Sequence, residues 1–175
     1  MKSQLLVLAV ALTAMGCGEK NATPPTETAQ TVTLPVDYTY KGAFTIGDMK
    51  NVQVVAECNK RLSEHNSNID EFVADSLHWV MPDGTEFDIP HDSAVAFIKK
   101  FIESTSSIKI VFTAQIPLYN AENNDEWVAS WTEETYTFKD GTVEYANFHE
   151  IYGMVNGKIR ELYQFAQKIP DKKEP

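Results

Sequence analysis

The sequence of 175 residues has little cysteine, glycine, proline or positive charge, and each shortage excludes a class of protein. Two cysteines exclude a disulfide-rich scaffold, and eight glycines with eight prolines exclude collagen-like and low-complexity chains. Fifteen Lys and Arg stand against 25 Asp and Glu, and the resulting formal net charge of -10 disfavours nucleic acid as a partner. The remainder, 43% hydrophobic and 23% charged, is typical of one acidic globular domain with appendages.

No apolar run is long enough for a transmembrane helix, which takes about 20 residues. The run Leu5 to Ala14 follows Lys2 and precedes small residues, which predicts a secretory signal peptide over residues 1–16. The stretch Ala14-Met15-Gly16-Cys17 resembles the lipobox of bacterial lipoproteins. This resemblance implies a lipidated Cys17 and a protein anchored to a membrane of the cell envelope, the outer membrane rather than the inner. The alternative is ordinary cleavage and a soluble secreted protein.

The chain after the signal peptide divides by composition into three parts. Residues 17–47 are expected to form the lipidated N-terminus and a flexible linker, because Gly18 to Val36 is rich in Thr, Pro and Ala. Residues 48–169 are expected to form the folded domain, and residues 170–175 a polar tail. Cys58 falls in an amphipathic pattern within the domain, which predicts a buried structural thiol.

Hydrophobic periodicity predicts helices first and long strands afterwards. A helix is expected from Asp48 to about His65, a short helix opened by Asn68 and Glu71, and a hairpin of Ser76–Met81 with Thr85–Ile89. A further helix, capped by Asp92 or Ser93, ends near Ser104. Four strands follow, namely Ile108 to Leu118 with its alternate residues on one face, Glu126 to Lys139, Thr142 to Val155 and Lys158 to Lys168.

This order of elements resembles the nuclear transport factor 2-like superfamily. The segments DEWVASW, FKDG, VNGKI and LYQFAQK are more closely similar to SnoaL-like lipoproteins of Bacteroidota-type bacteria. The resemblance implies an α+β fold in which a strongly curved antiparallel sheet wraps the N-terminal helices as a cone. It also implies a pocket at the wide end and, often, a homodimer through the outer sheet face.

Two tight turns set the expected strand register. Asp140-Gly141 and Asn156-Gly157 predict two-residue hairpin loops, with Lys139 opposite Thr142 and Val155 opposite Lys158. The resulting faces are Ser130, Thr132, Asn147, His149, Ile151, Leu162 and Gln164 on one side, and Trp131, Glu133, Phe148, Glu150, Tyr163 and Phe165 on the other.

The resemblance directs the residues matching Leu162, Gln164 and Ala166 inward, so the first face is expected to line the pocket. A single bulge, for instance at Gly153, would exchange the faces. The predicted ligand-binding residues are Trp79, Met81, Ser130, Thr132, Asn147, His149 and Gln164. The second face, with its large aromatic side chains, is the candidate dimer surface.

Catalytic machinery is not evident in the sequence. Alignment with the ketosteroid isomerases of this superfamily puts their carboxylate base at Met81, their tyrosine donor near Glu57 or Cys58, and their acid donor between His149 and Ile151. A methionine cannot take a proton, so at most one of the three roles remains. Histidines lack metal-ligand spacing and no glycine-rich phosphate loop occurs, so neither metal nor cofactor is expected.

The sequence therefore predicts a cell-envelope lipoprotein whose pocket binds a small, apolar or partly polar molecule, or a partner. One alternative is a SnoaL-like isomerase, cyclase or dehydratase in which His149 is the acid/base and Asn147 or Thr132 orients the substrate. The other is a structural dimerisation or assembly module. An open apolar cavity would favour a ligand over the structural alternative.

Overall fold

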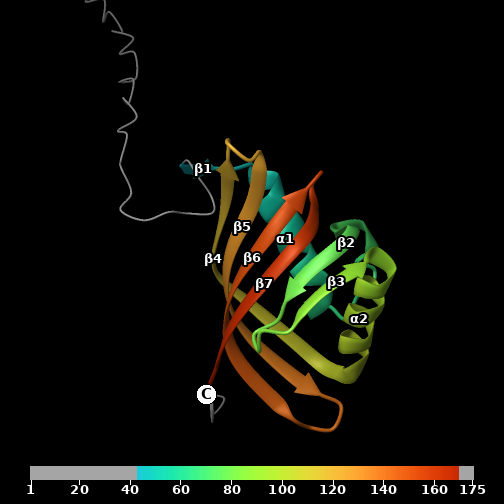
Figure 1. Ribbon diagram of the computed structural model, residues 1–175. Helices are drawn as coiled ribbons and strands as arrows, with labels where there is room; N and C mark the ends of the chain where they lie inside the picture. The colour runs from blue at the N-terminus through green and yellow to red at the C-terminus, as the bar shows by residue number, and fades with distance from the viewer. Residues whose placement is uncertain (1–42, 170–175) are drawn as a thin grey trace, which may run out of the picture. The chain divides into compact units, whose positions relative to one another are not determined.

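The computed structural model describes residues 43–169, and the fold is drawn in Figure 1. The predicted signal peptide, the predicted lipid anchor at Cys17 and the predicted tail lie outside the described residues. So does all of the predicted linker except residues 43–47. Within residues 43–169, neither helix has the length and apolar character needed to cross a membrane.

Two α-helices, one short 3-10 helix and seven strands make up the domain. In chain order they are β1 (Phe44–Ile46), α1 (Met49–Ser63), η1 (Asp70–Phe72), β2 (Val73–Val80), β3 (Glu86–Pro90), α2 (His91–Ser104), β4 (Thr105–Asn120), β5 (Asp125–Phe138), β6 (Val143–Val155) and β7 (Lys158–Lys168). The strands form one sheet in the order β1-β4-β5-β6-β7-β2-β3, antiparallel except between β2 and β7. Strand β1 pairs with the end of β4, so the predicted linker is wrong for residues 44–46.

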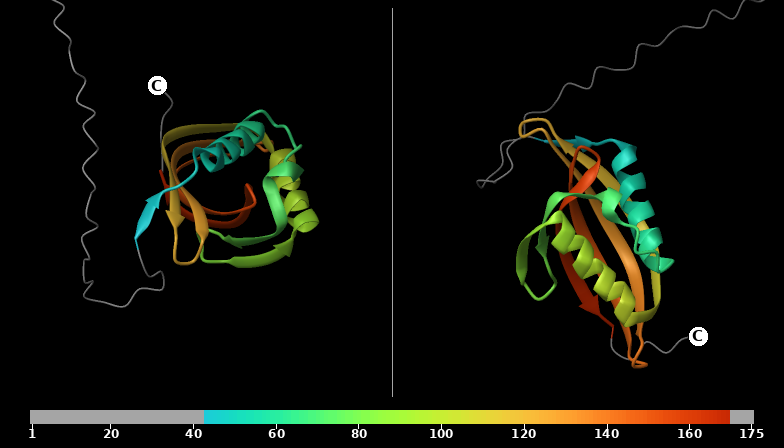
Figure 2. Two further views of the ribbon diagram at one scale, coloured as in Figure 1. Left: turned by 90° about the horizontal axis from the view of Figure 1, so that it is seen from above. Right: turned by 90° about the vertical axis from the view of Figure 1, so that its right-hand side faces the viewer.

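The sheet is strongly curved and both helices lie against its concave side, as the two views of Figure 2 show. This is the predicted α+β cone. Helix α1 is capped by Asp48, whose side chain accepts a hydrogen bond from the Lys50 amide at 2.9 Å. Helix α2 follows Pro90 directly and has no side-chain cap, so the predicted cap at Asp92 or Ser93 is wrong.

The core joins both helices to the inner face of the sheet. Its members are apolar side chains of α1, α2, β2, β5, β6, β7 and the segment around η1. Val55, Ile69 and Val128 are entirely buried. Cys58 belongs to this cluster, as predicted. Because the core occupies only part of the concave face, the rest of that face is free to line a cavity.

The hairpin between β5 and β6 has a longer loop than predicted. Thr137 pairs with Val143, and the Phe138 amide donates to the Thr142 carbonyl at 2.8 Å. The loop therefore has three residues, Lys139, Asp140 and Gly141, with Gly141 at φ +90°. A type I turn closed by a left-handed glycine has this form. Because of the added residue, each side chain of β6 lies on the face of the sheet opposite to the predicted one.

A second irregularity lies between β6 and β7. The two-residue loop at Asn156-Gly157 pairs Val155 with Lys158 as predicted, but Gly153 then pairs with Glu161 although Met154 pairs with Ile159. Arg160 is thus an extra residue on β7, a bulge that turns the face over again. The longer loop before β6 and the bulge in β7 each shift the register by one residue. Together they leave β5 and β7 with the relative facing that was predicted. The predicted faces are therefore wrong for β6 alone: Phe148 and Glu150 point inward, whereas Asn147 and His149 point outward.

Strand β4 also changes face along its length. Phe112 pairs with Thr132 but Ala114 pairs with Trp131, so Thr113 is an extra residue. Ile108 and Ile110 line the inner side, and Ile116, beyond the bulge, is 38% exposed. The predicted single apolar face over the whole strand is therefore wrong.

Gly153 allows the close approach of β6 to its neighbours. A Cβ added there would lie 2.9 Å from the Glu161 Cβ and 3.1 Å from the Trp127 Cζ3. Gly153→Ala is therefore expected to lower the free energy of unfolding by about 1–3 kcal/mol, measured by urea denaturation. Val155→Ala, at a side chain on the same strand that is 49% exposed, should change it by about 0.5 kcal/mol or less. Equal effects of the two substitutions would contradict this account.

Candidate functional site

A cavity of about 610 Å³ lies between the concave face of the sheet and the two helices. Its deep end is formed by buried residues such as Val73, Leu77 and Tyr152. Its mouth carries exposed charged side chains from four different elements or turns: Asp83, Lys100, Glu144 and Lys168. The volume lies within the range of about 300–1,000 Å³ that is usual for small-molecule pockets.

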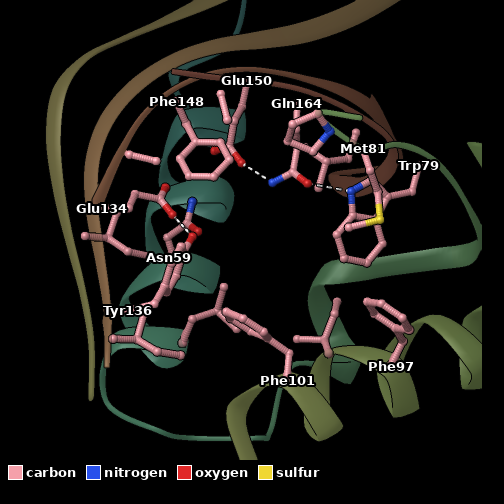
Figure 3. Close-up of a pocket in the computed structure, with 18 of the residues that line it drawn as sticks. Asn59, Trp79, Met81, Phe97, Phe101, Glu134, Tyr136, Phe148, Glu150 and Gln164 are labelled. Atoms are coloured by element: carbon pink, nitrogen blue, oxygen red, sulfur yellow. Dashed lines mark hydrogen bonds between the residues drawn. The ribbon is translucent and has the colours of Figure 1, made fainter. Parts of the chain in front are cut away.

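Aromatic side chains make up much of the cavity wall, as Figure 3 shows. The Phe101 and Tyr136 rings pack edge to face with their centroids 5.2 Å apart, and the centroids of the Tyr136 and Phe148 rings are 6.4 Å apart. On another side of the cavity, the Trp79 and Phe97 rings meet at 5.3 Å. These rings come from β2, α2, β5 and β6, so the wall depends on the complete cone.

Glu150 is the most deeply buried acid in the cavity wall, at 4% exposure. The Gln164 amide nitrogen donates to its Oε1 at 2.7 Å, and the Tyr152 hydroxyl donates to its Oε2 at 2.5 Å. The Trp79 indole in turn donates to the Gln164 Oε1 at 2.7 Å, and the Asn59 amide donates to the Tyr152 hydroxyl at 3.2 Å. Figure 3 shows the Trp79-Gln164-Glu150 part of this chain across the cavity wall.

Glu134 is a second buried acid of the wall, on the neighbouring strand β5, at 5% exposure. It accepts hydrogen bonds from the Thr132 hydroxyl at 2.7 Å and from the Tyr136 hydroxyl. The Glu134–Tyr136 and Glu150–Tyr152 pairs have the same spacing, since residues two apart in a strand share a face. Sequence reasoning missed both acids and their tyrosines, and the repeated Glu-x-Tyr pattern on adjacent strands was the signal that could have found them.

Burial changes the acidity of this wall. Removal from water raises the pKa of Glu150 to about 7, with a further increase from the Glu134 charge, against the lowering effect of the Tyr152 and Gln164 hydrogen bonds. Burial also raises the pKa of Glu134. Within residues 43–169, no lysine, arginine or histidine makes an ion pair with either carboxyl group. Glu150 thus changes its charge near neutral pH.

Cys58 lies in the same wall but does not supply a nucleophile. Burial raises the pKa of its thiol to about 12, so the reactive thiolate is scarce at neutral pH.

The structure separates the predicted ligand-binding residues into three groups. Trp79, Met81 and Gln164 line the cavity. Ser130 and Thr132 are buried on the inner face but lie behind the lining. Thr132 supports Glu134, and Ser130 is paired in register with Glu150.

The prediction that Asn147 and His149 line the pocket is wrong. Asn147 is exposed, and the His149 ring stacks on Trp131 at 4.6 Å on the outer sheet face. Since neighbouring residues of a strand point to opposite sides, Glu150 takes the inward place that sequence reasoning gave to His149. His149 therefore does not reach the cavity, and the predicted acid/base role for it is withdrawn.

The outer face carries Trp131 and Phe165, as expected, but has His149 where Phe148 was expected. His149 lies 6.1 Å from Phe165, which is 58% exposed, and Trp131 completes the row. The homodimer through this face stays a prediction.

Solved structures with this architecture are numerous, although no family model matches the sequence and no curated protein matches it. An LEH-like epoxide hydrolase from M. tuberculosis superposes with a TM-score of 0.58 at 8% identity, over 68% of this chain and 84% of the other. The epoxide hydrolase/cyclase-like enzyme SalBIII, with a role in pyran ring formation in the polyether salinomycin, gives 0.56 at 15% identity, over 68% and 92%.

A nuclear transport factor 2-like protein of unknown function from Exiguobacterium sp. 255-15 gives a TM-score of 0.52 at 18% identity, over 67% of this chain and 98% of that protein. Together with the curved sheet and its helices, these similarities show that residues 43–169 have the nuclear transport factor 2-like fold.

Proposed function

We propose that residues 43–169 form a small-molecule-binding domain that encloses a largely apolar ligand in the cone. The observation that carries this proposal is the 610 Å³ cavity, whose wall below the charged mouth is built mainly from aromatic and aliphatic side chains around one hydrogen-bonded polar edge. Burial of the ligand against the aromatic rings would supply most of the binding free energy, because apolar burial contributes about 25 cal/mol per Å². The structural-module alternative is weaker, since packing alone has no use for such an opening.

The polar edge would orient the ligand. Gln164 and Tyr152 are held in place by Trp79 and Asn59, so the Glu150 carboxyl group cannot turn freely. A fixed polar group in an apolar wall selects ligands with a polar atom at the matching position. The similarity in fold to an epoxide hydrolase and to a cyclase-like enzyme of polyether formation supports a small organic molecule as the ligand.

The proposal also places this domain in the cell envelope. The signal peptide and Cys17 predicted from the sequence would deliver the domain there and hold it at a membrane. Such a domain would capture its ligand outside the cytoplasm.

Proton transfer is the second candidate function, and one observation favours it. The Glu150 carboxyl group, with a pKa of about 7, can both donate and accept a proton near neutral pH. It would serve an isomerase, cyclase or dehydratase in place of His149. Met81, which the sequence alignment puts at the place of the base in ketosteroid isomerases, lines the cavity but cannot take a proton, so no second acid/base group follows from that comparison. Turnover of a bound ligand by the wild type, lost in Glu150→Gln, would favour the enzyme over the binder.

Narrowing the cavity tests the binding proposal directly. Ala166 lines the cavity, and Ala166→Trp is expected to weaken binding of the neutral fluorescent probe N-phenyl-1-naphthylamine by about tenfold or more, equivalent to about 1.4 kcal/mol. The matched control is Ala114→Trp on the outer face, where Ala114 pairs with Trp131 and is exposed. Fluorescence titration measures both. Failure of the wild type to bind the probe, or equal losses in the two variants, would overturn the proposal.

A further inference from the structure

The two acids of the cavity wall are supplied with hydrogen-bond donors but with no positive charge. Within residues 43–169 the partners of Glu134 and Glu150 are two tyrosine hydroxyls, one threonine hydroxyl and one amide, all of them neutral. Burying a charged carboxylate is costly unless it is paired with an opposite charge. The lysines of the lining, Lys100 and Lys168, lie at the exposed mouth and pair with neither acid. The buried part of the wall, with two acids and no paired cation, is therefore complementary to a positively charged ligand.

The hydrogen bonds around Glu150 are arranged for the charged form of the acid. The Trp79 indole can only donate, so it fixes the oxygen of the Gln164 amide toward itself and turns the amide NH₂ toward Glu150. The Tyr152 hydroxyl accepts from Asn59 and directs its own hydrogen at the other Glu150 oxygen. Both oxygens of Glu150 thus act as acceptors, which is the arrangement a carboxylate requires.

The surrounding wall is suited to a cation as well. Phe148 and Tyr136 belong to the same part of the lining as the two acids, and Figure 3 shows their rings beside Glu134 and Glu150 around the open centre. Faces of aromatic rings attract organic cations, by about 0.5–2 kcal/mol each when water is excluded. Carboxylates and aromatic rings together are the chemistry that recognises an ammonium group.

We propose that the ligand of this cavity is an apolar organic amine, bound as its ammonium ion with the charged nitrogen against Glu150 and Glu134. The inference rests on the proposed binding function and names its ligand class. The hydrocarbon part of the amine fills the aromatic part of the cavity. The ammonium N–H groups donate to carboxylate lone pairs that the protein donors leave unused, since each carboxylate oxygen can accept more than one hydrogen bond.

Binding of the ammonium ion is coupled to release of a proton from the wall. The other titratable groups near Glu150 are Glu134 and Tyr136 of β5, Tyr152 of β6 and Cys58 of α1, and burial raises the pKa of each. Asp83, Lys100, Glu144 and Lys168 lie at the exposed mouth, where solvent screens them. The amine binds only the ionised acid. At pH values below the pKa of that acid, its affinity therefore rises by up to about tenfold for each unit by which the pH is raised.

Matched probes test the charge requirement. The probes are 2-naphthylmethylamine, which is protonated below pH 8, and the isosteric neutral alcohol 2-naphthylmethanol. At pH 8 the wild type is expected to bind the amine about ten- to a hundredfold more tightly than the alcohol, as for hydrogen bonds to charged groups. Calorimetry in two buffers of different ionisation enthalpy should detect proton release with the amine near pH 6.5 and none with the alcohol.

Two glutamate substitutions separate the site from a general charge effect. Glu150→Gln should weaken the amine about tenfold or more and leave the alcohol unchanged within about threefold. The control is Glu161→Gln, because Glu161 forms the same Glu-x-Tyr pair with Tyr163, its side chain at 3.0 Å from the tyrosine hydroxyl, but lies outside the cavity lining. It should change neither affinity. Retention of N-phenyl-1-naphthylamine binding checks that Glu150→Gln keeps its fold.

The results distinguish this inference from the binding function on which it rests. Equal affinity of the wild type for amine and alcohol, or a Glu150→Gln variant that still prefers the amine, would overturn the amine while leaving the pocket as a binding site. If the wild type binds N-phenyl-1-naphthylamine but neither 2-naphthylmethylamine nor 2-naphthylmethanol, the proposal of an amine ligand is likewise overturned and the binding function is kept. Failure of the wild type to bind N-phenyl-1-naphthylamine would overturn the proposed function, and the amine with it.

Discussion

Replacement of Glu150 by glutamine is expected to stabilise the fold at pH 8 by on the order of 3 kcal/mol and to have little effect at pH 4. The pKa of Glu150 is raised from 4.5 to about 7 in the folded state. Below pH 4.5 the acid is protonated in both folded and unfolded chains, so burying it does not require a charge to be removed from water, and the free energy of unfolding carries no penalty from it. Between pH 4.5 and about 7 the unfolded chain releases a proton that the folded chain keeps, so the stability present at low pH is lost over this range, and above pH 7 the buried side chain is ionised.

Glutamine resembles the protonated acid, and in both the Tyr152 hydroxyl accepts a hydrogen bond in place of the one it donates to the carboxylate. The oxygen of the new glutamine can accept from Gln164, and its amide nitrogen can donate to the Tyr152 hydroxyl, which already accepts from Asn59 and has a second lone pair. Urea denaturation of both proteins between pH 4 and pH 8 measures the difference. Glu161→Gln serves as the control, with no such trend expected. A difference between wild type and Glu150→Gln that does not grow with pH would contradict the raised pKa.

Replacement of Tyr152 by phenylalanine is expected to destabilise the fold by about 2–4 kcal/mol at pH 8, and by less at pH 4. The hydroxyl lost in this substitution is buried, donates to Glu150 and accepts from Asn59. Its removal leaves an ionised buried acid with one donor fewer and an amide N–H without its acceptor. At low pH the acid is neutral, so only the smaller part of the penalty remains.

A matched tyrosine on the outer surface controls for the loss of a hydroxyl. Tyr163→Phe removes the hydroxyl that donates to Glu161 at 3.0 Å, in a pair of the same Glu-x-Tyr spacing but only partly buried. Exposed or half-exposed interactions contribute little, so its effect should be about 0.5 kcal/mol or less. Equal losses in Tyr152→Phe and Tyr163→Phe, or a Tyr152→Phe loss independent of pH, would contradict the role given to the buried network.

Periodicity predicts the elements well, because helices and strands here carry strong local signals. Asp48 caps α1, the Pro82-Asp83-Gly84 turn joins β2 to β3, and the four long strands occur in their predicted order. The apolar pattern that defines each element is the one that packs the core, so local and tertiary preferences agree.

Strand register is harder to predict, because it depends on single residues that have no pattern of their own. Asp140-Gly141 alone predicts a two-residue loop, but Lys139 joins it. Arg160 bulges from β7, and nothing in its neighbours distinguishes it from a regular strand residue. One residue of shift moves every side chain to the opposite face. The prediction therefore directs Asn147 and His149 into the cavity in place of Phe148 and Glu150.

The acids of the candidate site escape prediction for a related reason. A glutamate in a strand is usually a solvated residue, and only the pairing of β5 with β6 puts Glu134 and Glu150 together on the concave wall. Trp79, Met81 and Gln164 are correctly predicted to line the cavity, because alternation along β2 and the family resemblance for β7 assign these strands to their correct faces.

The alternation along β6 separates two surfaces that can change independently over evolutionary time. Phe148, Glu150 and Tyr152 belong to the interior, whereas the alternate residues Asn147, His149 and Ile151 belong to the exterior. Substitutions at the even-numbered positions would alter ligand preference, and those at the odd-numbered positions would alter how the molecule meets its surroundings. A lineage of such proteins could thus diversify its specificity while conserving its contacts, or the reverse, within a single strand.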